Sequence, residues 1–169
     1  MKKVIVLVLL TGSLFALESM SSVFLGMSSV EFDIENDADN GVYFGADGFM
    51  YTQIEGLAVG VGGDYTGFNL PKYRYTNNSD DYTLAMQLKL GYSFEGLISW
   101  PVQLKTSLGY GVSRMYAENS WGYQYDVSLE SKVYKSFGVG VKYKYVDTGS
   151  DIALLEDYTA VIGYARITF

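Results

Sequence analysis

The chain has 169 residues, contains neither Cys nor His, and carries a formal net charge of −7 at pH 7. This length suits a single domain, the absence of Cys excludes a disulfide framework, and the acidic charge argues against nucleic acid or anionic lipid as an electrostatic partner. With 16 Tyr and 19 Gly against only 2 Pro, the composition favours β-sheet over helix.

The first residues predict a secretory leader. Lys2 and Lys3 precede an apolar run from Val4 to Leu10, and the segment TGSLFA follows, with small residues at positions 11–13 and at Ala16. Because this run is too short to span a bilayer as a helix, we interpret residues 1–16 as a cleaved signal peptide and residues 17–169 as the mature domain. Cleavage removes two positive charges and makes the mature chain more acidic.

Eight segments of alternating apolar and polar residues follow in chain order, each about ten residues long and bounded by turn residues. They cover residues 23–33, 41–51, 57–67, 82–94, 102–113, 123–134, 137–146 and 158–169. This length is what a tilted strand needs to cross the core of a bilayer. Connections after the second, fourth and sixth segments are short, whereas those after the first, third, fifth and seventh are longer and more acidic. That alternation is typical of an up-and-down barrel with short periplasmic turns and long outer loops.

The polar parity of these segments distinguishes a membrane barrel from a soluble one. In residues 82–94, Leu84, Leu88 and Tyr92 share the apolar parity, and Gln87 and Lys89 share the other. The polar parity is mostly Gly, Ala, Ser and Thr with isolated charges, which suits a narrow lumen better than a face in bulk water. The sequence therefore predicts an all-β fold, an eight-stranded antiparallel up-and-down transmembrane β-barrel.

Aromatic positions provide an independent argument, because Tyr and Trp collect at both membrane interfaces. A soluble sandwich with scattered aromatics would not produce two bands. We expect one girdle at the outer end and one at the periplasmic end. The outer set is Tyr65, Tyr82, Tyr110, Tyr123, Tyr125, Tyr143 and Tyr145, and the periplasmic set is Phe24, Tyr92, Phe94, Trp100, Phe137 and Phe169.

The inward parity contains charges of both signs. The acidic members are Glu31, Asp33, Asp47, Asp64, Asp126 and Glu130, and the basic members are Lys89, Lys105, Lys132, Lys142, Lys144 and Arg166. Enclosed charges must be paired or hydrated. Two interpretations remain open, a charge network that fills the barrel and a gated polar path for ions or small solutes, and the narrow lumen of eight strands favours the first.

The alternating strands and the ending VIGYARITF, with Val161, Gly163, Ala165 and Ile167 on the parity of the terminal Phe169, resemble small outer-membrane β-barrel proteins of the OmpA/OmpX type. The resemblance implies export to the outer membrane of a Gram-negative bacterium. It also implies that Phe169 forms part of the signal read by the barrel-assembly machinery. Ala165 departs from the family pattern, in which a bulkier residue is usual.

An acidic segment, EFDIENDADNG, is a weak candidate for calcium. Asp33, Glu35, Asp37 and Asp39 alternate there and could supply oxygen ligands, but an ordinary solvated loop is the favoured explanation of such a run of charges. We expect no metal or other cofactor. Two predicted loops carry aromatic residues that could contact an extracellular partner, one with Tyr73, Arg74 and Tyr75 and the other with Tyr116 and Trp121.

The sequence offers little for catalysis. Outer-membrane barrel enzymes resemble one another in using a His beside Ser or an acid, and this chain has no His, so we expect it not to be an enzyme. The predicted role is structural or surface interaction, with acidic loops displayed outside and lipid around the barrel. The alternative is a narrow porin-like channel. Transport of an apolar ligand through a lateral opening, as in OmpW-like barrels, has no specific residue in its favour.

Overall fold

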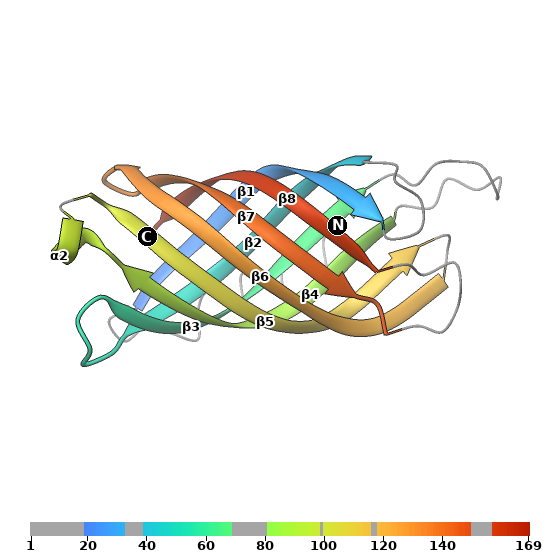
Figure 1. Cartoon of the computed structure of the whole chain (residues 1–169), viewed down its shortest axis with the longest axis horizontal. Coiled ribbons are helices and arrows are strands. Elements are labelled where there is room, and N and C mark those ends of the chain that lie inside the picture. Colours follow the sequence, from blue (N-terminus) through green and yellow to red (C-terminus); the bar gives the residue numbers. More distant parts are fainter. Residues whose placement is uncertain (1–18, 33–38, 69–80, 99, 116–117, 150–156) are drawn as a thin grey trace.

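The computed structural model describes residues 19–32, 39–68, 81–98, 100–115, 118–149 and 157–169, and it shows a closed antiparallel barrel (Figure 1). Each strand is hydrogen-bonded to its neighbours in the sequence, and β1 pairs with β8 to close the ring. The predicted fold class is confirmed. The predicted leader, residues 1–16, lies outside the described residues.

The strands follow one another almost without other secondary structure. They are β1 (Ser19–Phe32), β2 (Asp39–Tyr51), β3 (Leu57–Phe68), β4 (Asp81–Ser93), β5 (Val102–Met115), β6 (Glu118–Tyr134), β7 (Phe137–Asp147) and β8 (Tyr158–Thr168). A single turn of helix, α2 (Glu95–Ile98), lies between β4 and β5. Within the described residues, no helix is long and apolar enough to cross a membrane.

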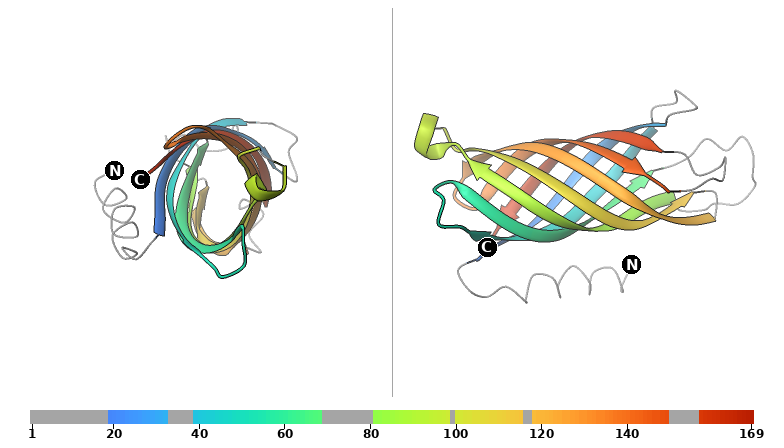
Figure 2. Two further views of the ribbon diagram at one scale, coloured as in Figure 1. Left: turned by 90° about the vertical axis from the view of Figure 1, so that its left-hand side faces the viewer. Right: turned by 60° about the horizontal axis from the view of Figure 1, so that its bottom comes forward.

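The two ends of the barrel differ. One end, which we call the short-turn end, carries the β2–β3, β4–β5 and β6–β7 connections, and the opposite end is the long-loop end (Figure 1). The β2–β3 turn closes at Gly56, whose φ of 79° is a left-handed conformation that glycine adopts without steric cost. Figure 2 shows the strands tilted around the barrel axis, as closure of a sheet requires.

One predicted connection is shorter than expected. The β5–β6 register continues to Met115 opposite Glu118, so that only residues 116–117 separate these strands. The prediction of a long loop there is wrong because polar residues such as Asn119 and Ser120 were interpreted as loop although they pair with β5. Trp121 therefore lies in a strand, while Tyr73, Arg74, Tyr75 and Tyr116 lie outside the described residues.

Burial alternates along the strands and separates an outward apolar face from an inward face of small and polar residues. Leu25, Met27, Met86 and Leu88 are each at least 60% exposed, which is expected of side chains that face lipid. The inward face is apolar near the long-loop end. Buried side chains there include Val30, Phe32, Phe68, Met115, Val146, Tyr158 and Ile162.

Exposed aromatic residues form a band at each end of the barrel. Near the long-loop end these are Tyr110, Trp121, Tyr123, Tyr125 and Tyr143, and near the short-turn end they are Tyr51, Trp100, Tyr134, Phe137 and Phe169. Phe24 is an exception to the predicted girdle, since it is buried inside the barrel and stacks on Tyr43 with ring centroids 5.3 Å apart. On β1 both parities are rich in apolar residues, so the sequence pattern did not separate its two faces.

Candidate functional site

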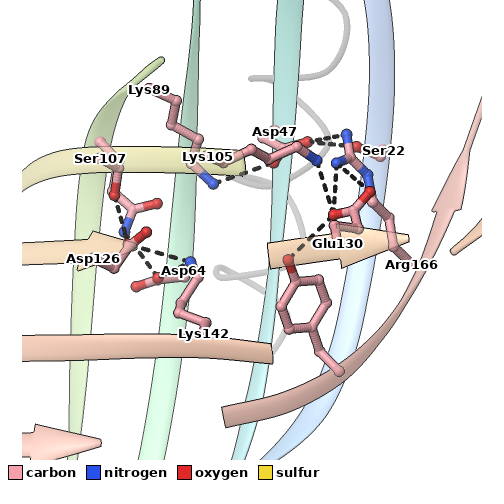
Figure 3. A network of polar contacts seen from close by, with 12 residues as sticks. Ser22, Asp47, Asp64, Lys89, Lys105, Ser107, Asp126, Glu130, Lys142 and Arg166 are labelled. Atoms are coloured by element: carbon pink, nitrogen blue, oxygen red, sulfur yellow. Dashed lines mark hydrogen bonds and ion pairs between the residues drawn. The ribbon is translucent and has the colours of Figure 1, made fainter. Parts of the chain in front are cut away.

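The charged interior is the most distinctive chemical feature of the barrel (Figure 3). Nine of the side chains predicted to face the lumen lie inside it, each less than a tenth exposed. They come from seven strands and are Asp47, Asp64, Lys89, Lys105, Asp126, Glu130, Lys142, Lys144 and Arg166. Strand alternation places them there, because each occupies the buried parity of its own strand.

Four of these residues form a central cluster: Asp64, Asp126, Lys142 and Lys144. Lys144 Nζ lies 3.0 Å from Asp64 Oδ1. Lys142 Nζ lies 3.2 Å from Asp126 Oδ2 and 3.6 Å from Asp64 Oδ2. Two carboxylates thus face two ammonium groups, and the pairs join β3 and β6 to β7 across the interior.

Neutral side chains complete the hydrogen bonding of the central cluster. Gln87 Nε2 donates to Asp64 at 2.9 Å and to Asp126 at 2.8 Å, and Gln124 Nε2 donates to Asp64 at 3.1 Å. Tyr43 accepts a hydrogen bond from Lys142 Nζ at 2.6 Å and donates one to Asp64 at 3.2 Å. The sequence pattern placed Gln87 on the inward parity, but the predicted network contained only charged residues and so did not include these neutral side chains.

Five residues form a second group, the vestibule cluster: Asp47, Glu130, Lys89, Lys105 and Arg166. Arg166 is its hub, with Nη1 2.9 Å from both carboxylate oxygens of Glu130 and Nη2 3.0 Å from Asp47. Lys105 Nζ lies 2.8 Å from Glu130, and Lys89 Nζ lies 3.2 Å from Asp47. Two carboxylates therefore hold three cations.

Other inward side chains also contact the vestibule cluster. Ser22 donates a hydrogen bond to Asp47, and the Tyr164 hydroxyl donates to Glu130 at 3.2 Å. Aromatic rings lie beside the ammonium groups. Lys89 Nζ is 5.0 Å from the centre of the Phe24 ring, and Lys105 Nζ is 5.3 Å from that of Phe49. At these distances the ring faces attract cations.

A small cavity lies between the two clusters. It is bordered by Phe24, Tyr43, Lys89 and Lys142 and has a volume of about 10 Å³, close to the minimum that a single water molecule occupies. A much larger cavity of about 470 Å³ opens at the short-turn end. It reaches inward to Glu130 and Arg166 and is bordered near its mouth by Glu55, Glu95 and Lys135.

Two predicted lumen charges lie elsewhere. Glu31 is exposed on the outward parity of β1, because the inward set of that strand is Ser22, Phe24, Ser28, Val30 and Phe32. The prediction for Glu31 is wrong. Because β1 has apolar residues on both faces, its inward parity was assigned from the charge of Glu31, and that assignment was the opposite of the observed one. Lys132 is exposed near the end of β6, where the register with β7 shifts, and it borders the large cavity.

The remaining predicted positions lie at chain ends and loops. Asp33, Glu35 and Asp37 lie outside the described residues, and for Asp39, which begins β2, only the backbone is described. No group of three or more potential metal ligands occurs among the described residues. Phe169 is 78% exposed, and its amide donates to the Ser21 carbonyl at 2.8 Å, which fixes the chain end beside β1.

Comparison with known proteins identifies the fold. No family model and no curated protein matches the chain. Among solved structures, Neisserial surface protein A has 12% identity and a TM-score of 0.56, with 90% of this chain and 98% of that chain covered. The attachment invasion locus protein Ail of Yersinia pestis, in complex with the heparin analogue sucrose octasulfate, has 16% identity and a TM-score of 0.57, with 90% and 100% covered.

A third similar structure is the N-terminal β-barrel domain of Pseudomonas aeruginosa OprF. It has 8% identity and a TM-score of 0.53, and the match covers 90% of this chain and 98% of that domain. At such low identity these likenesses establish the fold alone. The chain has the eight-stranded barrel fold of small outer-membrane proteins, and the predicted OmpA/OmpX-type resemblance is confirmed at that level.

Proposed function

We propose that the protein is an outer-membrane barrel with a filled interior, which supports the envelope and interacts with partners through its long-loop end. The observation that carries this proposal is that nine charged side chains are buried and paired inside the barrel, with a cavity of only about 10 Å³ between the two ion clusters. This cavity has room for about one water molecule, which is less than a hydrated ion occupies, so an ion could pass through it only if the surrounding side chains moved.

The energetic cost of separating the buried ion pairs supports an interior that stays filled by side chains. A passing ion would have to separate contacts such as Lys144 with Asp64 and Arg166 with Glu130, all of which are buried. Breaking a buried pair strands a charge away from water and costs about 3–5 kcal/mol. Several such pairs would have to open together, which makes spontaneous opening rare.

The outer surface supports a membrane location. The barrel exposes a broad apolar face between two aromatic bands, the arrangement found in transmembrane barrels. We place the long-loop end outside and the short-turn end in the periplasm of a Gram-negative bacterium, after export by a cleaved leader. Phe169 then lies at the periplasmic end, where the barrel-assembly machinery would contact it.

A narrow channel is the second candidate, and the large cavity at the short-turn end favours it. That cavity brings solvent as far as Glu130 and Arg166, so an ion could enter from this end and meet the vestibule cluster. Conduction would still require both clusters to open. We propose no catalytic role, since carboxylates such as Asp64 and Asp126 are engaged with ammonium and amide groups.

Single-channel recording in a planar bilayer tests the choice. The refolded barrel is compared with Lys105→Ala, which removes a cation of the vestibule cluster, and with Lys135→Ala, which removes an exposed lysine near the cavity mouth. Heat-dependent gel mobility establishes that each variant is folded. We expect no steady openings from the unaltered barrel. Steady openings that change with Lys105→Ala and not with Lys135→Ala would instead establish the channel.

A further inference from the structure

A third cavity lies on the outside of the barrel. It is a groove of about 370 Å³ over strands β2 to β6, and its border is nearly all apolar. Phe44, Tyr65, Leu84, Val112 and Trp121 stand directly opposite one another on these five strands and cross the groove in one row. The groove therefore belongs to the lipid-facing surface and not to the charged interior.

Aromatic side chains border the groove, and a glycine on its floor leaves it deep. Phe44 and Tyr65 are stacked with ring centroids 4.6 Å apart, and Tyr110 and Trp121 are stacked at 5.6 Å. Gly63 lies on β3 two residues before Tyr65, on the outward parity, and is paired with Met86 of β4. A Cβ added there would approach only the Ala85 carbonyl oxygen, at 3.3 Å, so the hollow exists because residue 63 has no side chain.

A cation lies just beyond the groove, on its long-loop side, and does not line it. Arg114 is half-buried on the outward parity of β5, in the next outward-facing row after Val112, between Tyr82 of β4 and Asn119 of β6. Among the described residues, no group accepts a hydrogen bond from its buried Nε. An apolar groove with a guanidinium one outward-facing row beyond it matches a lipid, whose chain is apolar and whose phosphate is anionic.

We propose that this groove holds one acyl chain of a membrane lipid whose net-negative phosphate headgroup contacts Arg114. The inference rests on the proposed membrane location of this face. Because the whole chain is acidic, its long-range field does not attract such a lipid. The selectivity for an anionic lipid comes from direct contact between the guanidinium of Arg114 and the phosphate. It therefore depends on Arg114 and on the groove that holds the acyl chain.

Fluorescence of Trp121 provides a local measurement, because its ring borders the groove. The chain has 2 Trp, and replacing exposed Trp100 with Phe leaves Trp121 as the only one. This protein is reconstituted in phosphatidylcholine vesicles that contain increasing fractions of phosphatidylglycerol with brominated acyl chains, which quench nearby Trp. In a second series, phosphatidylcholine carries the bromine and phosphatidylglycerol does not. Comparing the quenching in the two series gives the affinity of the groove for phosphatidylglycerol relative to phosphatidylcholine. We expect phosphatidylglycerol to be favoured by about fivefold, the effect of one cation near a membrane surface.

Two further variants test the contact and the groove. Arg114→Gln should abolish the preference for phosphatidylglycerol, so that the relative affinity of the two lipids is about one. Lys135→Gln, at the other end of the barrel, should leave the preference unchanged. Gly63→Leu fills the groove and should lower quenching by either brominated lipid. Gly163→Leu is its control, since Gly163 also faces outward and has open space around it.

Equal preference in Arg114→Gln and the starting protein would overturn the proposal, as would equal quenching in the two Leu variants. Weak quenching by both lipids in the starting protein would also overturn it, and would indicate that a second copy of the chain covers Trp121. Heat-dependent gel mobility is measured on every sample. A barrel that does not insert would contradict the proposed membrane location, whereas an inserted barrel without preference contradicts only the lipid site.

Discussion

At the scale of single residues, Asp64 connects more of the interior than any other side chain described above. Its carboxylate binds Lys144 at 3.0 Å and accepts hydrogen bonds from Gln87, Gln124 and Tyr43. The Lys144 side chain is fully buried, so its charge depends on this carboxylate for compensation. Removing the negative charge alone is therefore more damaging than removing both charges.

We expect Asp64→Asn to lower the free energy of unfolding by about 3–5 kcal/mol, because it leaves buried ammonium groups without a counter-charge. Urea unfolding of the barrel in lipid vesicles, followed by gel mobility, measures this change. The double variant Asp64→Asn with Lys144→Met should recover part of the loss, since the stranded charge is also removed. A loss below about 1 kcal/mol in the single variant would contradict a tightly paired interior.

Gly140 shows how closely the interior is packed. A Cβ at this position would lie 2.6 Å from the Tyr164 ring, whose hydroxyl donates to Glu130. We expect Gly140→Val to cost about 1–3 kcal/mol in the same unfolding measurement, because the ring must move. Gly163→Val, on the open outward face, should change stability by less than about 0.5 kcal/mol. Similar effects of the two substitutions would show that Tyr164 has room to move.

At the scale of strands, the alternation of apolar and polar residues allowed most of the fold and most of the inward-facing residues to be predicted. In β4, β5 and β6 each face has one chemical character, so parity assigned Lys89, Lys105 and Asp126 to the interior from sequence alone. The same rule failed for Glu31, because β1 has apolar residues on both faces. The partners within the charge network could not be predicted from the sequence. They depend on the stagger between strands, which determines the level at which Arg166 of β8 meets Asp47 of β2.

Lipid exposure of the outward parity leads to a prediction for β4. Leu88 is 67% exposed near the middle of that strand, and we expect Leu88→Arg to cost about 2–4 kcal/mol in a bilayer. Thr159 lies opposite exposed Glu31 near the long-loop end, and Thr159→Arg should cost about 0–1 kcal/mol. Unfolding in vesicles compares the two variants. Equal costs would mean that Leu88 does not lie at the centre of the membrane.

At the scale of the whole molecule, the difference between the two ends predicts an orientation. The chain has no Cys, so a single introduced thiol reports one position. Glu118 begins β6 at the long-loop end, and Glu55 lies in the β2–β3 turn at the other, both exposed. We expect a membrane-impermeant maleimide to label Glu118→Cys on intact cells and Glu55→Cys only after lysis. The opposite pattern would reverse the orientation.

Pairing of β1 with β8 has a consequence for folding kinetics. Seven of the eight strand pairs join neighbours in the sequence, whereas this seam joins segments such as Met27 and Gly163, and its closure must restrict nearly the whole chain. Arg166 of β8 binds Asp47 of β2 across β1, so this contact forms only when the seam is closed. Interactions that form after the rate-limiting step slow unfolding and leave the folding rate nearly unchanged. We expect the seam to close late in folding, so that the Arg166–Asp47 ion pair slows unfolding of the finished barrel much more than it changes the folding rate.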